Sequence, residues 1–328
     1  MHIETEDWHT AGEPFRIVTS VETVGATVAE RRVHAISGPA DGARRFLCLE
    51  PRGHDDMYGG FVTPPDDEGA DFGVLFWHKD GFSTACGHGT IALGAWAVET
   101  RKVAAPDDGE AVVTIDVPSG RVRAIVRRAA GHTIDVVFRN VESRVLAQGI
   151  PLSTSRGDVT VDLVFGGAVY ATLPAASVGL AVESAHTTEL IAIGREIKWT
   201  LNEHPAAQLA DVRLSGVYGT ILVDDLGRDV SGGPHQRNVT VFADGEVDRS
   251  PCGSGTSARA ALLAADGVLG DGRSLRHDSI VGTTFAARVT GDGPDGVLTE
   301  VEGMAYRTGE HRFVLDPRDP LGTGFVLR

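Results

Sequence analysis

The chain has 328 residues, a formal net charge of −15, 41 glycines and three cysteines. This length exceeds one ordinary core and predicts two domains, and the negative charge disfavours nucleic acid or an anionic membrane as a partner. The acidic N-terminus lacks the apolar core of a signal peptide, and no apolar run in the sequence is long enough to span a bilayer. Three cysteines cannot complete a disulfide framework, so we expect a cytoplasmic protein with reduced thiols.

In the first half of the chain, short apolar segments predict strands at 17–21 and 72–77 and a hairpin formed by 112–117 and 121–126. Another apolar run occupies residues 46–49 and ends at a Pro-Arg-Gly turn signal. Cys48 lies inside that run, with no histidine or cation beside it in sequence, which indicates a buried structural thiol.

The second half begins near residue 128 and shows a similar pattern of short apolar segments. Apolar segments predict strands at 159–165, 217–223, 239–242, 281–289 and 296–301, and a helix at 187–201 that is capped by Thr187 or Thr188. The stretch 224–233, rich in Asp and Gly, predicts a loop. Many strands with one or two helices per half indicate a largely antiparallel α+β fold rather than a doubly wound sheet.

One short phrase occurs twice. Residues 86–92 read CGHGTIA and residues 252–258 read CGSGTSA, and each phrase opens a stretch suited to a helix. The two cysteines are 252 − 86 = 166 residues apart, about half the length of the chain. A motif repeated at this distance predicts two similar lobes, each placing a helix N-terminus and a thiol at a shared cleft.

Two cysteines at helix N-termini suit acid–base chemistry. The positive end of a helix and a nearby histidine favour the thiolate, and a thiolate facing a thiol across a substrate can remove a proton from one face and return one to the other. Such a pair inverts a stereocentre without a metal or an organic cofactor. The backbone N–H groups of the first turns would bind a carboxylate and stabilise its developing charge; these groups belong to Gly87, His88, Gly89, Gly253, Ser254 and Gly255.

These segments resemble the proline racemase family. The resemblance is carried by CGHGTIA at 86–92, DRSPCGSGTSA at 248–258, DWHTAGEP at 7–14 and EPRGHDDMYG at 50–59, and it continues to the DPRDP segment at 316–320. The family contains proline racemases, 4-hydroxyproline 2-epimerases and trans-3-hydroxy-L-proline dehydratases. Its fold resembles that of diaminopimelate epimerase.

The resemblance implies two pseudo-symmetric α+β lobes, each a curled antiparallel sheet around a central helix, with the active site between them. Residues 1–127 with about 308–328 form the lobe that carries Cys86, and residues 128–307 form the lobe that carries Cys252. By the same resemblance, Cys86 and Cys252 are the catalytic acid and base. Binding residues are His88 and Asp248 at the substrate's ring nitrogen, the amides of Gly87, His88, Gly253 and Ser254 at its carboxylate, and Tyr58 and Phe242 at the two sides of its ring.

Both cysteines are present, which favours inversion at Cα of proline or hydroxyproline, because the dehydratases of the family usually replace one cysteine with threonine or serine. Aromatic residues at positions 58 and 242 favour an unsubstituted ring, since a hydroxylated ring would need a polar partner. However, Ala168 stands where racemases often carry Asn, and segments 56–59, 165–171 and 217–221 resemble the dehydratases about as well. Dehydration of trans-3-hydroxy-L-proline therefore stays open as an alternative.

Two alternatives from other classes also stay open. A cysteine hydrolase would use Cys86 with His88, but residues two apart on a turn rarely face each other, and Cys252 would have no role. A non-catalytic imino-acid binder would not depend on either thiol. The other histidines show no ligand spacing, so no metal is predicted. The expected partner is a small imino acid, and the sequence is compatible with a homodimer.

Overall fold

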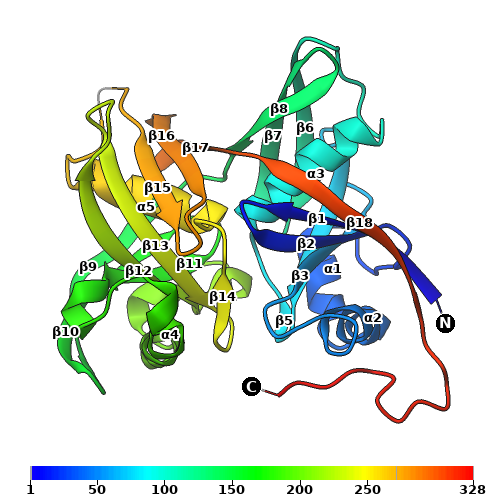
Figure 1. Ribbon diagram of the computed structural model, residues 1–328, viewed down its shortest axis with the longest axis horizontal. Coiled ribbons are helices and arrows are strands. Elements are labelled where there is room, and N and C mark those ends of the chain that lie inside the picture. The colour runs from blue at the N-terminus through cyan, green and yellow to red at the C-terminus, as the bar shows by residue number, and fades with distance from the viewer. Residues whose placement is uncertain (1, 271, 328) are drawn as a thin grey trace. The chain divides into compact units, whose positions relative to one another are not determined.

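A computed structural model describes residues 2–270 and 272–327. The chain divides into two compact parts, which we call unit 1 (Met1–Val137 with Met304–Arg328) and unit 2 (Phe138–Gly303). In Figure 1 unit 1 is blue, cyan and red, and unit 2 runs from green to orange. The sequence places the divisions at 127/128 and near 307/308; in the structure they fall inside strand β8 (His132–Arg139) and between β17 (Val297–Gly303) and β18 (Ala305–Val314).

Unit 1 combines a mixed sheet with helices. Its other strands are β1 (His2–Thr10), β2 (Glu13–Val18), β3 (Tyr58–Thr63), β4 (Phe72–His78), β5 (Gly81–Phe82), β6 (Gly109–Val117) and β7 (Gly120–Ala129), and its helices are α1 (Val28–Ala35), α2 (Pro39–Cys48) and α3 (Gly87–Glu99). Strand β1 pairs antiparallel with β18 and β2, β2 pairs parallel with β3, β3 antiparallel with β4, β4 parallel with β6, and β6 antiparallel with β7.

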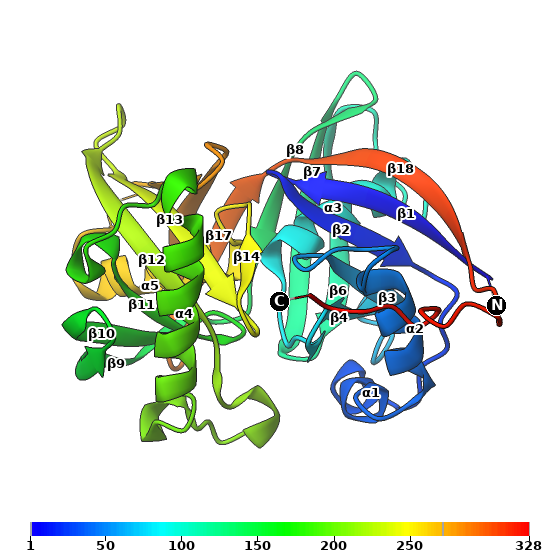
Figure 2. The ribbon, with the colours of Figure 1, turned by 60° about the horizontal axis from the view of Figure 1, so that its bottom comes forward.

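Unit 2 is built in the same way. Its other strands are β9 (Arg144–Thr154), β10 (Gly157–Phe165), β11 (Val169–Pro174), β12 (Val217–Arg228), β13 (Pro234–Phe242), β14 (Glu246–Asp248), β15 (Leu275–Ser279) and β16 (Thr284–Asp292). Its helices are α4 (Thr187–Leu201), α5 (Gly253–Ala265) and the short 3₁₀ segments η1 (Ala175–Val178), η2 (Ser184–His186), η3 (Pro205–Ala207) and η4 (Val212–Leu214). Helix α4 packs on β12 and β13, as Figure 2 shows.

The pairing pattern of unit 2 repeats that of unit 1. Strand β10 pairs antiparallel with β9 and β11, β11 pairs parallel with β12, β12 antiparallel with β13, β13 parallel with β15, and β15 antiparallel with β16. In each unit the cysteine-bearing helix lies in the connection between the two strands of the second parallel pair, α3 between β4 and β6 and α5 between β13 and β15. The prediction of an α+β fold in two similar halves is confirmed.

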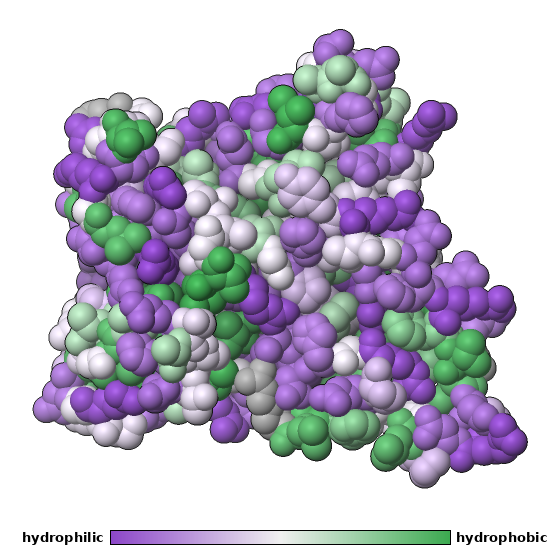
Figure 3. Space-filling model, viewed as in Figure 1, coloured by the Kyte–Doolittle hydropathy of each residue, from purple (hydrophilic) through white to green (hydrophobic). Residues whose placement is uncertain are grey.

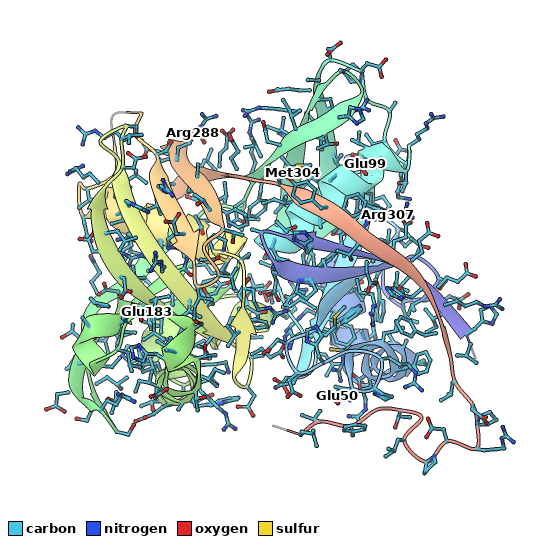
Figure 4. All side chains as sticks on the ribbon, viewed as in Figure 1. Glu50, Glu99, Glu183, Arg288, Met304 and Arg307 are labelled. Carbon is cyan, nitrogen blue, oxygen red and sulfur yellow. The ribbon has the colours of Figure 1, made fainter. Side chains whose placement is uncertain are left out.

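Helices α3 and α5 are buried nearly all round, since each packs into the concavity of its own sheet. Helix α3 contacts β1, β2, β6, β7 and β18, and α5 contacts β9, β10, β16 and β17. Small residues permit this approach: a Cβ at Gly94 of α3 would lie 2.5 Å from the Cβ of Ala124 on β7. The end of α3 is tied to the sheet where Trp96 Nε1 donates to Glu6 Oε1 at 3.0 Å. Figure 4 marks this end by Glu99 on α3 and Arg307 on β18.

Several local predictions need correction. The apolar run 46–49, which the sequence patterns did not assign to an element, ends helix α2, which begins with Pro39 at its first turn. Helix α4 has the predicted bounds, but its N-cap is His186, while the Thr187 hydroxyl donates to Ser184 O at 2.7 Å. The predicted loop 224–233 is strand in its first half, because β12 extends to Arg228, and the last strands begin at Thr284 and Val297.

Each unit has its own apolar core. In unit 1 the largest buried side chains include Phe46, Phe61 and Trp77, and Cys48 packs among them with no exposed surface, as the sequence predicts. The core of unit 2 gathers aliphatic side chains of β10–β13 and α4. Figure 3 shows hydrophilic residues over most of the visible surface. None of the helices that the structure describes has both the length and the apolar composition of a membrane-spanning segment.

Candidate active site

Cys86 is the N-cap of α3 and lies in ordinary extended backbone (φ −156°, ψ 105°). Its Sγ accepts a hydrogen bond from the Gly89 N–H at 3.2 Å and lies 3.4 Å from His88 Nδ1. The side chain is 5% exposed. A backbone donor, the positive end of a helix and an imidazole together stabilise negative charge on this sulfur.

Aromatic rings surround the histidine that contacts this thiol. The His88 ring lies edge-on to Tyr58 and Phe15, with centroids 5.0 and 5.8 Å away. The Tyr58 hydroxyl is hydrogen-bonded to Ser83 Oγ, so this ring carries a polar group at its tip. Gly89 leaves room for the arrangement: a Cβ there would lie 2.5 Å from the Phe15 ring and 2.8 Å from Cys86 Sγ. We call Cys86, His88, Tyr58, Phe15 and Ser83 the Cys86 site.

Cys252 is the N-cap of α5, but its backbone is left-handed (φ 63°, ψ 101°), which L-residues rarely adopt. Such a conformation costs on the order of 1–3 kcal/mol and persists only where the surroundings enforce it. Its side chain makes no regular cap hydrogen bond, although the Gly255 amide still acts on the sulfur. Sγ instead lies 3.9 Å from the Tyr170 hydroxyl, which is itself 2.7 Å from Ser254 Oγ. The same position in the repeated phrase therefore presents its thiol differently.

The electrostatics of Cys252 follow from this placement. Burial raises the pKa of the Cys252 thiol well above its usual value, and the nearby Asp248 carboxylate raises it further. The Gly255 amide and the side chains of Thr240 and Tyr170 lower this pKa, but by less. Burial also raises the pKa of Asp248 to about 6, although its Oδ1 accepts hydrogen bonds from the Ser250 N–H (2.8 Å) and hydroxyl (2.7 Å). At neutral pH Cys252 is thus a thiol beside an ionised carboxylate.

A chain of aromatic rings links Phe242 to this thiol. Phe242 stacks on Tyr218 with centroids 5.7 Å apart, and Tyr218 meets Tyr170 edge-on at 5.8 Å. Since Tyr170 lies beside Cys252, the structure brings Phe242, Asp248, Ser254 and Cys252 into one neighbourhood of unit 2. We call this neighbourhood, with Tyr170 and Tyr218, the Cys252 site.

Sequence analysis missed some of these residues. Phe15 and Tyr170 come from strands far from the cysteines in sequence, whereas Ser83 lies only three residues before Cys86 but carries no pattern that marks it. Tyr218 carried a usable signal, because Tyr-Gly occurs at 58–59 and again at 218–219, at the start of the matching strands β3 and β12. One argument was also wrong: Cys86 and His88 are only two residues apart, yet their side chains are in contact.

The proline racemase family model matches residues 6–326. The chain belongs to the proline racemase family. Within it, the chain is 42% identical to a trans-3-hydroxy-L-proline dehydratase of Burkholderia ambifaria over 99% of this chain and 98% of that protein. It is also 42% identical to a 3-hydroxyproline 2-epimerase of Burkholderia multivorans, again over 99% and 98% of the two chains.

A solved structure of a proline racemase family member agrees with this fold throughout. The hydroxyproline epimerase of Agrobacterium vitis, crystallised with trans-4-hydroxy-L-proline, has a TM-score of 0.90 at 29% identity and covers 99% of this chain and 95% of its own. The two curated relatives carry names from different reaction classes at the same identity, so similarity alone does not separate epimerase from dehydratase.

Proposed function

We propose that this protein epimerises 3-hydroxyproline at Cα, with Cys86 and Cys252 as the acid–base pair. The observation that carries the proposal is the presence of a cysteine at the N-terminus of both buried helices, α3 and α5. Elimination of water needs one base, whereas inversion needs a base and an acid on opposite faces of the substrate. The name of the Burkholderia multivorans relative supports the substrate.

The proposed reaction moves two protons. Cys86, as thiolate, takes the α-proton, and the electron pair of the broken C–H bond spreads into the carboxylate. First-turn N–H groups of Gly87, His88, Gly253 and Ser254 have no carbonyl within their helices, and they would bind this carboxylate as its charge grows. Cys252, as thiol, then gives its proton to the other face of Cα. The substrate leaves inverted, and the two sulfurs have exchanged protonation states. This scheme uses no cofactor and no metal.

Asp248 and the aromatic residues complete the proposed binding site. With a pKa of about 6, Asp248 is ionised at neutral pH and suits a positively charged ring nitrogen, with His88 as its polar counterpart. Tyr58 and Phe242 would flank the ring. The hydroxyls of Tyr58 and Ser83 supply the polar partner that a hydroxylated ring needs, so this site does not favour the unsubstituted ring expected from the sequence.

Dehydration of trans-3-hydroxy-L-proline is the second candidate, which the name of the Burkholderia ambifaria relative favours. Its first step is the same. The electron pair left on Cα then expels the 3-hydroxyl group, which takes up a proton and leaves as water, and the resulting enamine tautomerises to a cyclic imine. The two outcomes compete for one carbanion: proton donation from Cys252 gives the epimer, and loss of the hydroxyl gives the imine.

Proton NMR in D₂O tests the proposal with L-proline, trans-4-hydroxy-L-proline and trans-3-hydroxy-L-proline in separate samples. We expect the α-proton signal of the 3-hydroxy compound to disappear as the signals of its Cα epimer grow. Loss of all ring signals to a dehydrated product would establish the second candidate instead. No change in any sample would contradict both. None of the cysteines that the structure describes forms a disulfide, which suits the reducing cytoplasm that we propose as the compartment.

A further inference from the structure

The sulfur of Cys252 has a polar neighbour that the proposed reaction does not use, the hydroxyl of Tyr170. We propose that Tyr170 and Ser254 form a reversible hydrogen-bond chain, which accepts from Cys252 as a thiol and donates to it as a thiolate. Tyr170 thereby stabilises the thiolate that forms when Cys252 gives its proton to Cα. The inference rests on the proposed function, because it takes Cys252 as the acid.

The contacts of the Tyr170 hydroxyl form a short chain inside unit 2. Cys252 Sγ lies 3.9 Å from Tyr170 Oη with the thiol as donor, and Tyr170 Oη lies 2.7 Å from Ser254 Oγ, where either oxygen can donate. Tyr170 is fully buried, and Ser254 and Cys252 are 2% and 6% exposed. Hydrogen bonds of catalytic groups are often long before a substrate binds and tighten in the complex. The Tyr170 hydroxyl is therefore placed to act on the sulfur during the reaction.

A chain of hydroxyls serves both protonation states of the sulfur, because each hydroxyl can donate and accept. While Cys252 is a thiol, its S–H points at Tyr170 and the Tyr170 proton points at Ser254. When the thiol proton moves to Cα, the Tyr170 O–H turns to the sulfur and the Ser254 O–H turns to Tyr170. Only the S–H bond breaks, and both hydroxyls keep their protons. Burial raises the pKa of Tyr170 well above its ordinary value, so the phenol stays protonated.

Unit 1 contains the matching ring without the hydroxyl. Phe15 lies on β2 and Tyr170 on β11, and each of these strands pairs parallel with the strand that carries a Tyr-Gly pair near its start, β3 or β12. The Phe15 ring stacks on Tyr58 with centroids 6.3 Å apart, and the Tyr170 ring meets Tyr218 at 5.8 Å. The two rings therefore occupy corresponding places, and the hydroxyl is what unit 2 adds.

The residue two positions after each cysteine explains this addition. In unit 1 it is His88, which meets the Phe15 ring edge-on at 5.8 Å and places Nδ1 3.4 Å from Cys86 Sγ. In unit 2 it is Ser254, whose shorter side chain bonds to the Tyr170 hydroxyl. The phenol thus provides the sulfur of unit 2 with a polar contact that the imidazole provides in unit 1.

A donor at this sulfur counteracts the groups that oppose the thiolate. Burial raises the pKa of the Cys252 thiol, and the Asp248 carboxylate raises it further. The donors that lower this pKa are the amide of Gly255 and the side chains of Thr240 and Tyr170. Loss of the Tyr170 hydroxyl therefore weakens Cys252 as an acid.

The substitution Tyr170→Phe removes this oxygen and leaves the kind of ring that unit 1 has at the matching place. We expect inversion of trans-3-hydroxy-L-proline to fall by about tenfold, because the forming thiolate loses a donor. Exchange of the α-proton for deuterium with retention, which Cys86 performs, should stay within about twofold of the parent. Proton NMR in D₂O gives both rates. A merely structural role of Tyr170 would slow both rates alike.

Alkylation provides a readout without substrate. In Tyr170→Phe, iodoacetamide should alkylate Cys252 about tenfold more slowly relative to Cys86 in the same sample, which corresponds to one pKa unit, since the thiolate is the reacting form. Peptide mass spectrometry gives both rates. Lack of turnover in the parent would contradict the proposed function alone, because the alkylation rates still test the hydrogen-bond chain.

Two further variants complete the experiment. Ser254→Ala removes the far end of the chain and should slow alkylation of Cys252 by about threefold, and it decides the matter if Tyr170→Phe does not fold. Tyr306→Phe removes the hydroxyl of an exposed tyrosine on β18 and should leave inversion, exchange and alkylation unchanged. A parent-like ratio of Cys252 to Cys86 alkylation in both Tyr170→Phe and Ser254→Ala would overturn the inference, and so would equal losses of inversion and exchange in Tyr170→Phe.

Discussion

The Cys86 site and the Cys252 site occupy the same place in two topologically matching units, yet their sulfurs have opposite surroundings. Cys86 is relaxed, and its sulfur receives an N–H hydrogen bond and lies beside an imidazole. Cys252 is strained, makes no regular cap hydrogen bond and lies beside a carboxylate. A duplicated motif has thus kept the position of the thiol while one backbone torsion and one neighbour changed. The difference supports the roles that we propose, with Cys86 as the base and Cys252 as the acid.

The largest effect should come from Cys86→Ser. A serine hydroxyl is a far weaker base than a thiolate, so removal of the α-proton should slow by about 10³-fold, and epimer and any dehydrated product should be lost together. Exchange of the α-proton for deuterium, followed by NMR, measures this step. Unchanged binding of pyrrole-2-carboxylate, a planar mimic of the deprotonated substrate, would show that the site is intact. Exchange at the parent rate would remove Cys86 from the mechanism.

Cys252→Ser should separate the two sites. We expect epimer formation from trans-3-hydroxy-L-proline to fall by about 10²-fold, because the acid is lost, while Cys86 still removes the α-proton and deuterium exchange with retention persists. The share of dehydrated product among all products should rise, since the carbanion is captured less often. The same NMR samples give all of these quantities. Equal losses of exchange and inversion would show that the two cysteines are not divided into base and acid.

Asp248→Asn tests the carboxylate that distinguishes the Cys252 site. Burial raises the pKa of Asp248 to about 6 in the native state, whereas the ordinary pKa of an aspartate is 3.8. The native state therefore binds more protons between these pH values and loses stability as the pH rises through this window. This loss lowers the free energy of unfolding of the parent by about 3 kcal/mol at pH 8 and by roughly half of that at pH 5, and the neutral amide of the variant avoids it. Thermal unfolding at both pH values should show the variant more stable than the parent, with the larger gain at the higher pH. A gain that is independent of pH would contradict a raised pKa.

The smallest effects should come from the glycines of the two first turns. A Cβ at position 89 would lie 2.5 Å from the Phe15 ring, whereas one at position 255 would meet Cys252 Sγ at 3.0 Å and Ile221 Cδ1 at 3.1 Å. Gly89→Ala should therefore destabilise by about 1–3 kcal/mol. For Gly255→Ala the contact is milder, and the higher helix propensity of alanine, worth about 1 kcal/mol, should offset most of the destabilisation that it causes. Denaturant unfolding of the two variants side by side checks the order, and the reverse order would show that the Cys86 site is the looser one.

The repeat and the starts of the two helices could be predicted from the sequence, because each CGxGT motif marks both within a few adjacent residues. The sequence could not reveal the left-handed backbone of Cys252, because local patterns do not encode contacts from other strands, such as that of Asn238 Nδ2 on β13, which donates to the Pro251 carbonyl at 3.1 Å. The run 46–49 could not be assigned to an element, because four apolar residues fit a strand or a buried helix end equally well. The aromatic rings of Phe15 and Tyr170 reach the thiols through sheet pairing, which local patterns do not encode.

Unit 1 is formed by the two segments that flank unit 2 in the chain, and this affects the order in which the two units can fold. Strand β1 precedes unit 2 in the chain, but its antiparallel partner β18 begins only at Ala305, after unit 2. Unit 2 is one continuous segment, so all of it is made before β18 can pair with β1. The Cys86-bearing unit therefore closes after unit 2 is available to fold, through the contacts with the longest sequence separation.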